Sequence, residues 1–307
     1  MDAEQKIQEN RLIRYLHHCR ILASPGSMLS RSARLILITF LFSQQVAAQN
    51  SRPGFRLIRD KGEVVGVDYF GAAGLEQAKL HEYPKLESVH FVYGTEITRQ
   101  DIRYLAKLKN LVELKMGFAG VDSEYVTVDG KLNELSKLKK LEAIHLCKQF
   151  MRDEDLRFIG DLPELECLEF NANTNGHGKP GPTATDDCVK HLVKAKSLRD
   201  LCILGEVSFS DQFVKDLTDG LPGLEHLEIA SDQLTDETLR RLGTRCKNLK
   251  WLNVSSKRFT DEGIDLLSQS NRLERLWGVL AGTNRKVLSL GCRPQTIKAS
   301  RVNDEED

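Results

Sequence analysis

The residue pattern most directly linked to chemistry is a glycine-rich segment, residues 176–181, which reads GHGKPG. It matches G-x-G-x-x-G, where glycines let backbone N–H groups approach a pyrophosphate. Pro180 and Pro182 stand where a phosphate cradle needs backbone donors, and proline has none. Although a strand-like segment precedes it and a helix-like one follows, the segment lies in a polar insertion. We therefore expect no dinucleotide cofactor.

Cysteine and histidine give no catalytic or metal-binding signature. The seven cysteines include no C-x-x-C pair, so a zinc ribbon is unsupported. His90, His145 and His226 fall in strand-like segments, but their spacing fixes no carboxylate beside them, and a metal site stays a minor alternative. No G-x-S-x-G elbow is present, and nothing indicates a nucleophile–histidine–acid triad. The sequence offers no positive sign of an enzyme, a cofactor or a resident metal.

An internal repeat supplies the elements that would position any site. Leucine accounts for 44 of the 307 residues, and the pattern L-x-x-L-x-L, with apolar substitutes, recurs along the chain. Its anchor residues are Val64, Leu86, Leu111, Leu141, Leu165, Leu198, Leu224, Leu249 and Leu273. From Leu86 onward the interval between anchors is nearly constant, apart from two longer ones, Leu111 to Leu141 and Leu165 to Leu198. This spacing predicts a solenoid of about nine repeats.

Each unit has a second half that predicts a helix. Thr235-Asp236-Glu237 precedes the i, i+3 pair Leu239 and Leu242, and the other units open on Thr98, Thr185, Ser210 and Thr260. A threonine hydroxyl accepts an orphan backbone N–H, acidic residues in the first turn favour the helix dipole, and the apolar spacing gives one buried stripe. The interval from cap to next anchor varies by only one position among these units, so the helical half is nearly constant in length.

Over residues 64–280 these motifs resemble the leucine-rich repeat family, and the T-D-E helix start is most similar to its ribonuclease-inhibitor-like and cysteine-containing subtypes. The resemblance implies an α/β fold, a right-handed leucine-rich repeat solenoid with a parallel sheet on the concave face and helices on the convex face. One departure follows the strand, where Ser255 and Ser256 replace the usual Asn or Cys. We expect a repeat domain over 49–280, and a C-terminal cap with an acidic tail over 281–307.

Strand alternation predicts which side chains a partner would meet, because apolar positions point into the core and the intervening ones onto the concave face. The central exposed column comprises His90, Lys115, His145, Glu169, Cys202, Glu228, Asn253 and Trp277. The preceding column comprises Ser88, Glu113, Ala143, Cys167, Asp200, His226, Trp251 and Arg275. Neither column carries one sign of charge, so we expect neither a basic stripe for phosphate nor an acidic stripe for a cationic partner.

Two tryptophans and an arginine gather near the C-terminal end of these columns, and both residue types are enriched at interface hot spots. We predict a partner-binding patch made of Trp251, Trp277, Arg275, His226, Asn253 and Glu228. The alternative is that the tryptophans only seal the last repeats. The extra residues of the two longest units, 117–129 and 171–184, should form loops on one rim beside the sheet, where they are either part of the binding face or tolerated insertions.

The cysteines bear on the cellular compartment. Cys167 and Cys202 should lie on adjacent strands but two residues out of step, which places their Cα atoms roughly 8 Å apart and beyond the ~7 Å limit for a disulfide. Cys188 and Cys246 fall in helical segments and fit small buried hydrophobes. Largely unpaired cysteines are unusual in an oxidising compartment.

Residues 28–48 have the pattern of a secretory signal peptide, with Arg31 and Arg34 before the apolar run 35–42 and small residues at 46–48. The run is shorter than the about 20 residues that a membrane span needs. We expect residues 1–27 to be a mis-assigned extension ahead of a true start at Met28, and a bacterial-type exported protein, periplasmic or secreted. Otherwise the chain is cytoplasmic, with an amphipathic N-terminal helix.

The 44 basic and 44 acidic residues balance, which gives no reason to expect a nucleic-acid partner. An extended concave sheet suits protein recognition. The leading hypothesis is a non-enzymatic, monomeric binding module with a protein or glycan partner. A cytosolic adaptor resembling the repeat half of substrate receptors, and the regulatory arm of an enzyme, are the alternatives.

Overall fold

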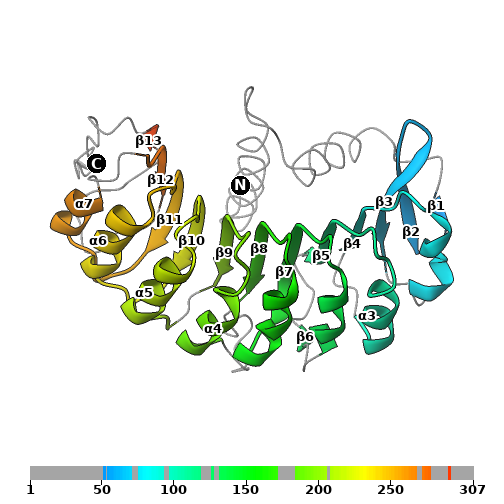
Figure 1. Cartoon of the computed structure of the whole chain (residues 1–307), viewed down its shortest axis with the longest axis horizontal. Helices are drawn as coiled ribbons and strands as arrows, with labels where there is room; N and C mark the ends of the chain where they lie inside the picture. Colours follow the sequence, from blue (N-terminus) through cyan, green and yellow to red (C-terminus); the bar gives the residue numbers. More distant parts are fainter. Residues whose placement is uncertain are drawn as a thin grey trace, which may run out of the picture.

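The computed structural model describes residues 51–52, 54–70, 75–92, 97–118, 126–127, 131–171, 184–205, 208–267, 272–277 and 290–291. These residues form one curved sheet whose strands line the inner side of an arch, with the helices along its outer side (Figure 1). The strands are β1 (Ser51–Arg52), β2 (Phe55–Asp60), β3 (Glu63–Tyr69), β4 (Ser88–Val92), β5 (Glu113–Phe118), β6 (Val126–Thr127), β7 (Ala143–Phe150), β8 (Cys167–Asn171), β9 (Asp200–Leu204), β10 (His226–Ala230), β11 (Trp251–Ser255), β12 (Arg275–Trp277) and β13 (Leu290–Gly291).

The helical segments on the outer side are of two kinds. The α-helices are α3 (Arg99–Leu105), α4 (Val189–Leu192), α5 (Asp211–Gly220), α6 (Asp236–Arg245) and α7 (Asp261–Leu267). The 3-10 helices are η1 (Leu75–Ala78), η2 (Leu80–Glu82), η3 (Lys131–Lys137), η4 (Asp153–Asp161) and η5 (Asp186–Cys188). The parallel sheet and the helices between its strands confirm the α/β solenoid.

The repeat motifs set the register of the sheet. The second apolar position of every copy pairs with its equivalent on the next strand, and all of these side chains are at most 1% exposed. The row runs through Val67, Val89, Leu114, Ile144, Leu168, Leu201, Leu227, Leu252 and Leu276. Full burial of one such side chain contributes about 1.5–3 kcal/mol, so this row is a main source of the solenoid's cohesion.

The parallel array begins at β3, as expected from the motif copy at Val64. Ahead of it, β2 and β3 form an antiparallel hairpin. Lys61 and Gly62 at its turn have φ values of 48° and 87°, which is the backbone that two-residue hairpins require. Within the described residues, β13 pairs antiparallel with β12 at the other end.

The expected helix caps are present, and they also link neighbouring repeats. Thr235 Oγ1 accepts a hydrogen bond from Glu237 N at 3.3 Å, as an N-cap should. The same Thr235 donates its own N–H and hydroxyl to the Asp211 carboxylate of the preceding repeat, at 2.9 and 2.6 Å. Equivalent bonds join Asp153 to Thr185, Asp186 to Ser210 and Asp236 to Thr260. We call this series the Asp–Thr ladder.

The longest helices belong to the units that contain one additional residue. The units of Ser210 and Thr235 have one more position between the cap and the next anchor leucine, and they hold the ten-residue helices α5 and α6. Units without this extra position, such as that of Thr98, hold shorter α-helices or 3-10 helices. In η3 and just after it, Leu132, Leu135 and Leu138 are buried at every third position, which fits the 3-10 period. The expectation of one uniform capped helix was therefore too simple.

Two serines replace the Asn of the usual repeat. Ser231 and Ser256 are 4% and 3% exposed, and each donates its hydroxyl to a backbone carbonyl of the preceding loop at 2.7 Å. Each hydroxyl also accepts a backbone N–H at 3.1 Å, from Gln233 and Arg258 respectively. The serines thus satisfy buried backbone groups that would otherwise be costly to bury.

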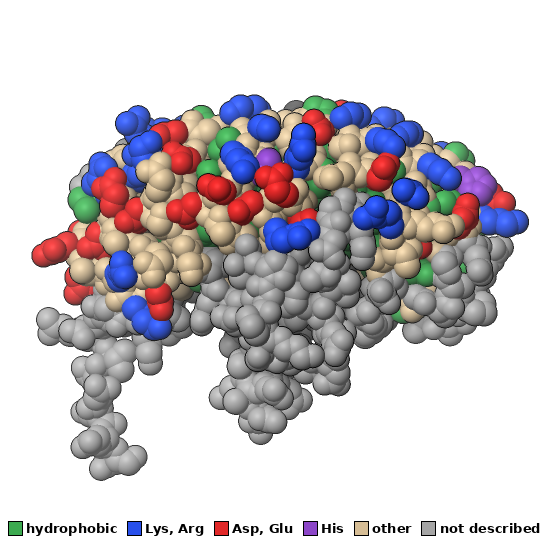
Figure 2. Space-filling model, turned by 90° about the horizontal axis from the view of Figure 1, so that it is seen from below, with side chains coloured by type: hydrophobic (Ala, Val, Ile, Leu, Met, Phe, Trp, Pro, Cys, Tyr) green, Lys and Arg blue, Asp and Glu red, His purple; other side chains and the backbone are tan. Residues whose placement is uncertain are grey.

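On the outer face, lysines lie beside the C-terminal ends of neighbouring helices. Figure 2 shows Lys and Arg along the upper edge of this face and most Asp and Glu below it. Lysines in the return loops donate to carbonyls at the ends of neighbouring helices: Lys139 Nζ to Asp161 O at 2.8 Å and Lys196 Nζ to Gly220 O at 3.1 Å. A cation is favoured at this end of a helix by the dipole.

Candidate partner-binding surface

The structure brings the six predicted binding residues into a grid of two rows on three parallel strands. His226, Trp251 and Arg275 share one register row of β10, β11 and β12. The second row consists of Glu228, Asn253 and Trp277. The side chain of Trp277 lies outside the described residues, and among the others His226 is the most deeply buried, at 7% exposed. Their part in partner binding stays a prediction.

His226 is held in place by its neighbours. Its Nδ1 pairs with the Asp200 carboxylate on β9. Its ring meets Trp251 edge-on, with centroids 6.4 Å apart and an interplanar angle of 88°. Such edge-to-face pairs are favourable beyond their buried area. His226 and Trp251, both predicted members of the patch, are therefore held together with Asp200, which the patch prediction omitted.

Every histidine of the concave columns has a carboxylate beside it in its register row. His90 Nδ1 lies 3.1 Å from Asp68, and His145 Nδ1 lies 2.8 Å from Glu169. The sequence-based view that no such neighbour could be fixed was wrong. The signal was present, because each carboxylate occupies the same motif position one repeat away from its histidine.

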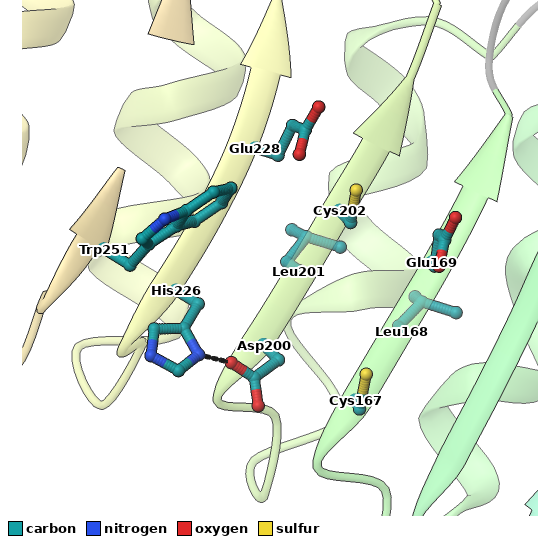
Figure 3. Close-up of a pocket in the computed structure, with 9 residues that line it drawn as sticks. All are labelled: Cys167, Leu168, Glu169, Asp200, Leu201, Cys202, His226, Glu228 and Trp251. Atoms are coloured by element: carbon teal, nitrogen blue, oxygen red, sulfur yellow. Dashed lines mark hydrogen bonds and ion pairs between the residues drawn. The ribbon is translucent and has the colours of Figure 1, made fainter. Parts of the chain in front are cut away.

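A pocket opens on the concave face between β8 and β11 (Figure 3). Its described lining consists of Cys167, Leu168, Glu169, Asp200, Leu201, Cys202, His226, Glu228 and Trp251. Figure 3 shows the Trp251 side chain reaching from β11 across β10, with Glu228 and Asp200 at opposite ends of the hollow. Three residues of the predicted patch therefore line the pocket, which extends away from β12 toward β8.

The pocket contains an acidic cluster that neither exposed column shows when considered alone. Glu169 and Glu228 come from the central column, whereas Asp200 comes from the preceding one. Register places all three around the same pocket, and its described lining contains no Lys or Arg. Neither column alone forms an acidic stripe, as expected, but the two columns together place three carboxylates around one pocket.

The two cysteines of the pocket do not form a disulfide. Cys167 pairs with Asp200 and Cys202 with Glu169, so the cysteines are two residues out of step, as expected. The buried Cys188 and Cys246 are not in disulfides either. Burial, with a smaller effect from Asp200 and Glu169, raises the pKa of the Cys167 thiol well above its usual value of 9.0. A raised pKa makes this thiol a weaker nucleophile, because the thiolate is the reactive form.

The N-terminal half of the same sheet face carries a chain of charged side chains. We call it the ion-pair chain, and it runs from Arg56 on β2 to Glu169 on β8. Its members are Arg56, Asp68, His90, Glu113, Lys115, His145 and Glu169. Glu113 is its centre: Lys115 Nζ lies 2.8 Å from Oε1, and His90 and His145 contribute Nε2 atoms at 3.6 and 3.9 Å.

Proton affinities in the chain reflect these neighbours. Burial alone would raise the pKa of Glu113, but Lys115, His90 and His145 outweigh it and hold that pKa far below the usual 4.5. Burial alone would lower the pKa of His90, but Asp68 and Glu113 outweigh it and raise the pKa above 6.5. Opposite charges at short range favour the charged form of each group.

In the described part of the chain, no group of three or more His, Cys, Asp or Glu side chains is arranged to hold a metal ion. Among the helices placed by the structure, none is long and apolar enough to cross a bilayer. The predicted rim loops fall mostly outside the described residues. Their placed parts are Gly117 and Phe118 in β5, β6 paired with the end of β7, and Asn171 and Ala184 at the ends of the second loop.

The register of the L-x-x-L-x-L strands and the capped helices between them define an α/β solenoid of the leucine-rich repeat type. No protein-family model matches the chain. Solved structures with similarity include a protein from Bacteroides fragilis, with 17% identity, a TM-score of 0.44, and coverage of 74% of this chain and 69% of that one. An internalin from Listeria monocytogenes has 17% identity and a TM-score of 0.36, covering 68% and 66%. The Toll–Spatzle complex of Drosophila gives 13% identity and a TM-score of 0.43, covering 69% of this chain and 26% of that one.

Proposed function

We propose that the chain is a non-enzymatic binding module whose concave sheet recognises a protein partner around β10 and β11. The observation that carries the proposal is the pocket at Trp251, which combines a partly exposed indole, carboxylates and a histidine on a rigid parallel sheet. Interfaces concentrate their binding energy in such central aromatic residues. Because the strands are fixed by the buried apolar row behind them, the surface is preorganised, which lowers the entropic cost of binding.

Affinity capture with matched variants tests this function. Trp251→Ala should reduce recovery of a stoichiometric protein partner at least tenfold relative to the unmodified chain, as expected for a hot-spot loss of about 2 kcal/mol. Arg240→Ala, at an exposed position on the outer face of α6, serves as the control and should leave recovery unchanged. Equal recovery with both variants would contradict the proposal, provided that both unfold like the unmodified chain.

Export is a second part of the proposal and rests on the signal-peptide pattern of residues 28–48. The lack of disulfides among the cysteines described above weighs against it, since unpaired thiols are uncommon in oxidising compartments. N-terminal sequencing of the protein from its native source decides whether the chain is exported. A mature end near residue 49 supports export, and an end at Met1 contradicts it.

A further inference from the structure

The pocket beside Trp251 has a charge that restricts what can enter it. Its described lining holds three carboxylates, Glu169, Asp200 and Glu228, against one imidazole, that of His226. The surroundings stay net negative even when both His226 and the Glu169 partner His145 carry a proton, because three negative charges exceed two positive charges. Carboxylate or phosphate ligands are therefore repelled at this position.

The aromatic side chain adds a preference of its own. A tryptophan ring face attracts a cation more strongly than the other aromatic rings do. In Figure 3 the indole of Trp251 and the carboxylate of Glu228 lie on the same side of the hollow, with Asp200 at the opposite end. A guanidinium entering here can contact an indole and still reach a carboxylate, and its planar fork suits carboxylate pairing.

Other occupants fit less well. The described lining residues form no group arranged to hold a metal ion, so a bare divalent cation lacks a cage. The lining is mixed: Leu168, Leu201, the two cysteines and the indole supply apolar surface, whereas three carboxylates and one imidazole supply polar groups. A neutral apolar group would bury these carboxylates without replacing their hydration.

We propose that this pocket receives an arginine side chain of the protein partner, with its guanidinium between the Trp251 indole and the Glu228 carboxylate. The proposal rests on the proposed function, since it names the chemistry by which the concave face selects its partner. It also gives a role to the acidic cluster that neither exposed column reveals.

The test uses the two indole N–H signals of the full chain, because Trp251 and Trp277 are its only tryptophans. The ¹⁵N-tryptophan-labelled protein is titrated with the acetylated, amidated peptide Gly-Gly-Arg-Gly-Gly, and a Trp277→Phe variant assigns the signals. A second peptide carries citrulline, the neutral isostere of arginine. The arginine peptide should shift the Trp251 signal in a saturable way, and the citrulline peptide should bind at least about fivefold more weakly.

Matched variants locate the charge. Glu228→Gln keeps the size of the side chain and should weaken the arginine peptide about fivefold to tenfold, whereas Glu274→Gln at an exposed position just before β12 should not. Equal shifts with citrulline, an unchanged affinity in Glu228→Gln, or no shift up to millimolar peptide would overturn the proposal. If capture of the partner still depends on Trp251 in those cases, the proposed function stands and only the arginine pocket fails.

Discussion

Two halves of one sheet face use the same backbone for different purposes. From β3 to β8 the concave side chains pair with one another along the ion-pair chain, with Glu113 at its centre. From β8 to β11 they surround a pocket beside Trp251. The difference teaches that the repeat fixes where a side chain lies, whereas the charges of its neighbours in the register row decide which ion pairs it forms.

The polar links between repeats follow the same division. In the first half a continuous series of them crosses the concave face. In the second half the concave face carries the His226–Asp200 pair, and further links lie at the helix N-termini, where the Asp–Thr ladder runs from Asp153 to Thr260. The ladder therefore joins the C-terminal repeats without using the side chains of the concave face.

The largest expected effect is on stability in the first half. Glu113→Ala leaves His90, Lys115 and His145 around a buried site without their shared carboxylate, and should lower the free energy of unfolding by about 3–5 kcal/mol. Urea unfolding followed by circular dichroism measures it. A loss of unfolding free energy below about 1 kcal/mol would show that the ion-pair chain is not a structural unit, and it would remove the contrast between the two halves.

A smaller effect is expected from the ladder behind the second half. Asp211→Ala removes the acceptor for Thr235 and Thr238, and should cost about 2 kcal/mol. Asp216→Ala on the same helix, whose partners are the exposed Gln212 and Lys215, is the matched control and should cost less than about 0.5 kcal/mol. If the two substitutions cost the same, the ladder does not join these repeats.

The stability that the ion-pair chain gives to the first half should depend on pH. The pKa of His90 is raised, so its contribution is present below 6.5 and is lost as the pH rises through the folded-state value. The pKa of Glu113 is lowered, so its contribution is present above 4.5 and is lost as the pH falls through the folded-state value. The contribution of His90 and Glu113 to the free energy of unfolding should therefore be greatest between pH 4.5 and pH 6.5. A Glu113→Gln chain measured across the same buffers should show a flatter profile, and an unchanged profile would rule out the ion-pair chain as its source.

The smallest stability effect should come from the pocket. Glu228→Gln should change the free energy of unfolding by less than about 0.5 kcal/mol, because Glu228 is only partly buried and Gln keeps the size of its side chain. Differential scanning calorimetry of this variant beside Glu113→Ala provides the comparison. A loss as large as that of Glu113→Ala would place Glu228 in the framework instead of the binding surface.

Much of the architecture could be predicted because each repeat is a local unit. The anchor leucines gave the sheet register, and Thr235 marked a true helix start. The length of the longest helices follows from the one extra position between cap and anchor, whereas helix type does not, because α3 and η5 both belong to units without that position. The contacts between repeats were missed, because acidic residues in the first turn were interpreted only through the helix dipole, whereas the Asp211 carboxylate also binds Thr235 of the next repeat.

The candidate site was predicted in part for the same reason. Trp251, His226 and Glu228 were recognised from residue type and strand alternation, and all three line the pocket. Asp200 and Glu169 were left out of the patch because each exposed column was considered alone. Their contribution depends on the diagonal neighbours that register brings together, so alignment of adjacent columns is the signal that would have found them.

Site-specific photo-crosslinking tests the central claim most directly. A benzoylphenylalanine placed at Asn253, in the middle of the predicted patch, is compared with one at the exposed Lys215 on the outer face of α5. The concave-face account predicts one defined protein adduct from position 253 and none from position 215. An adduct from position 215 alone, or the same adduct from both positions, would contradict recognition by the concave sheet.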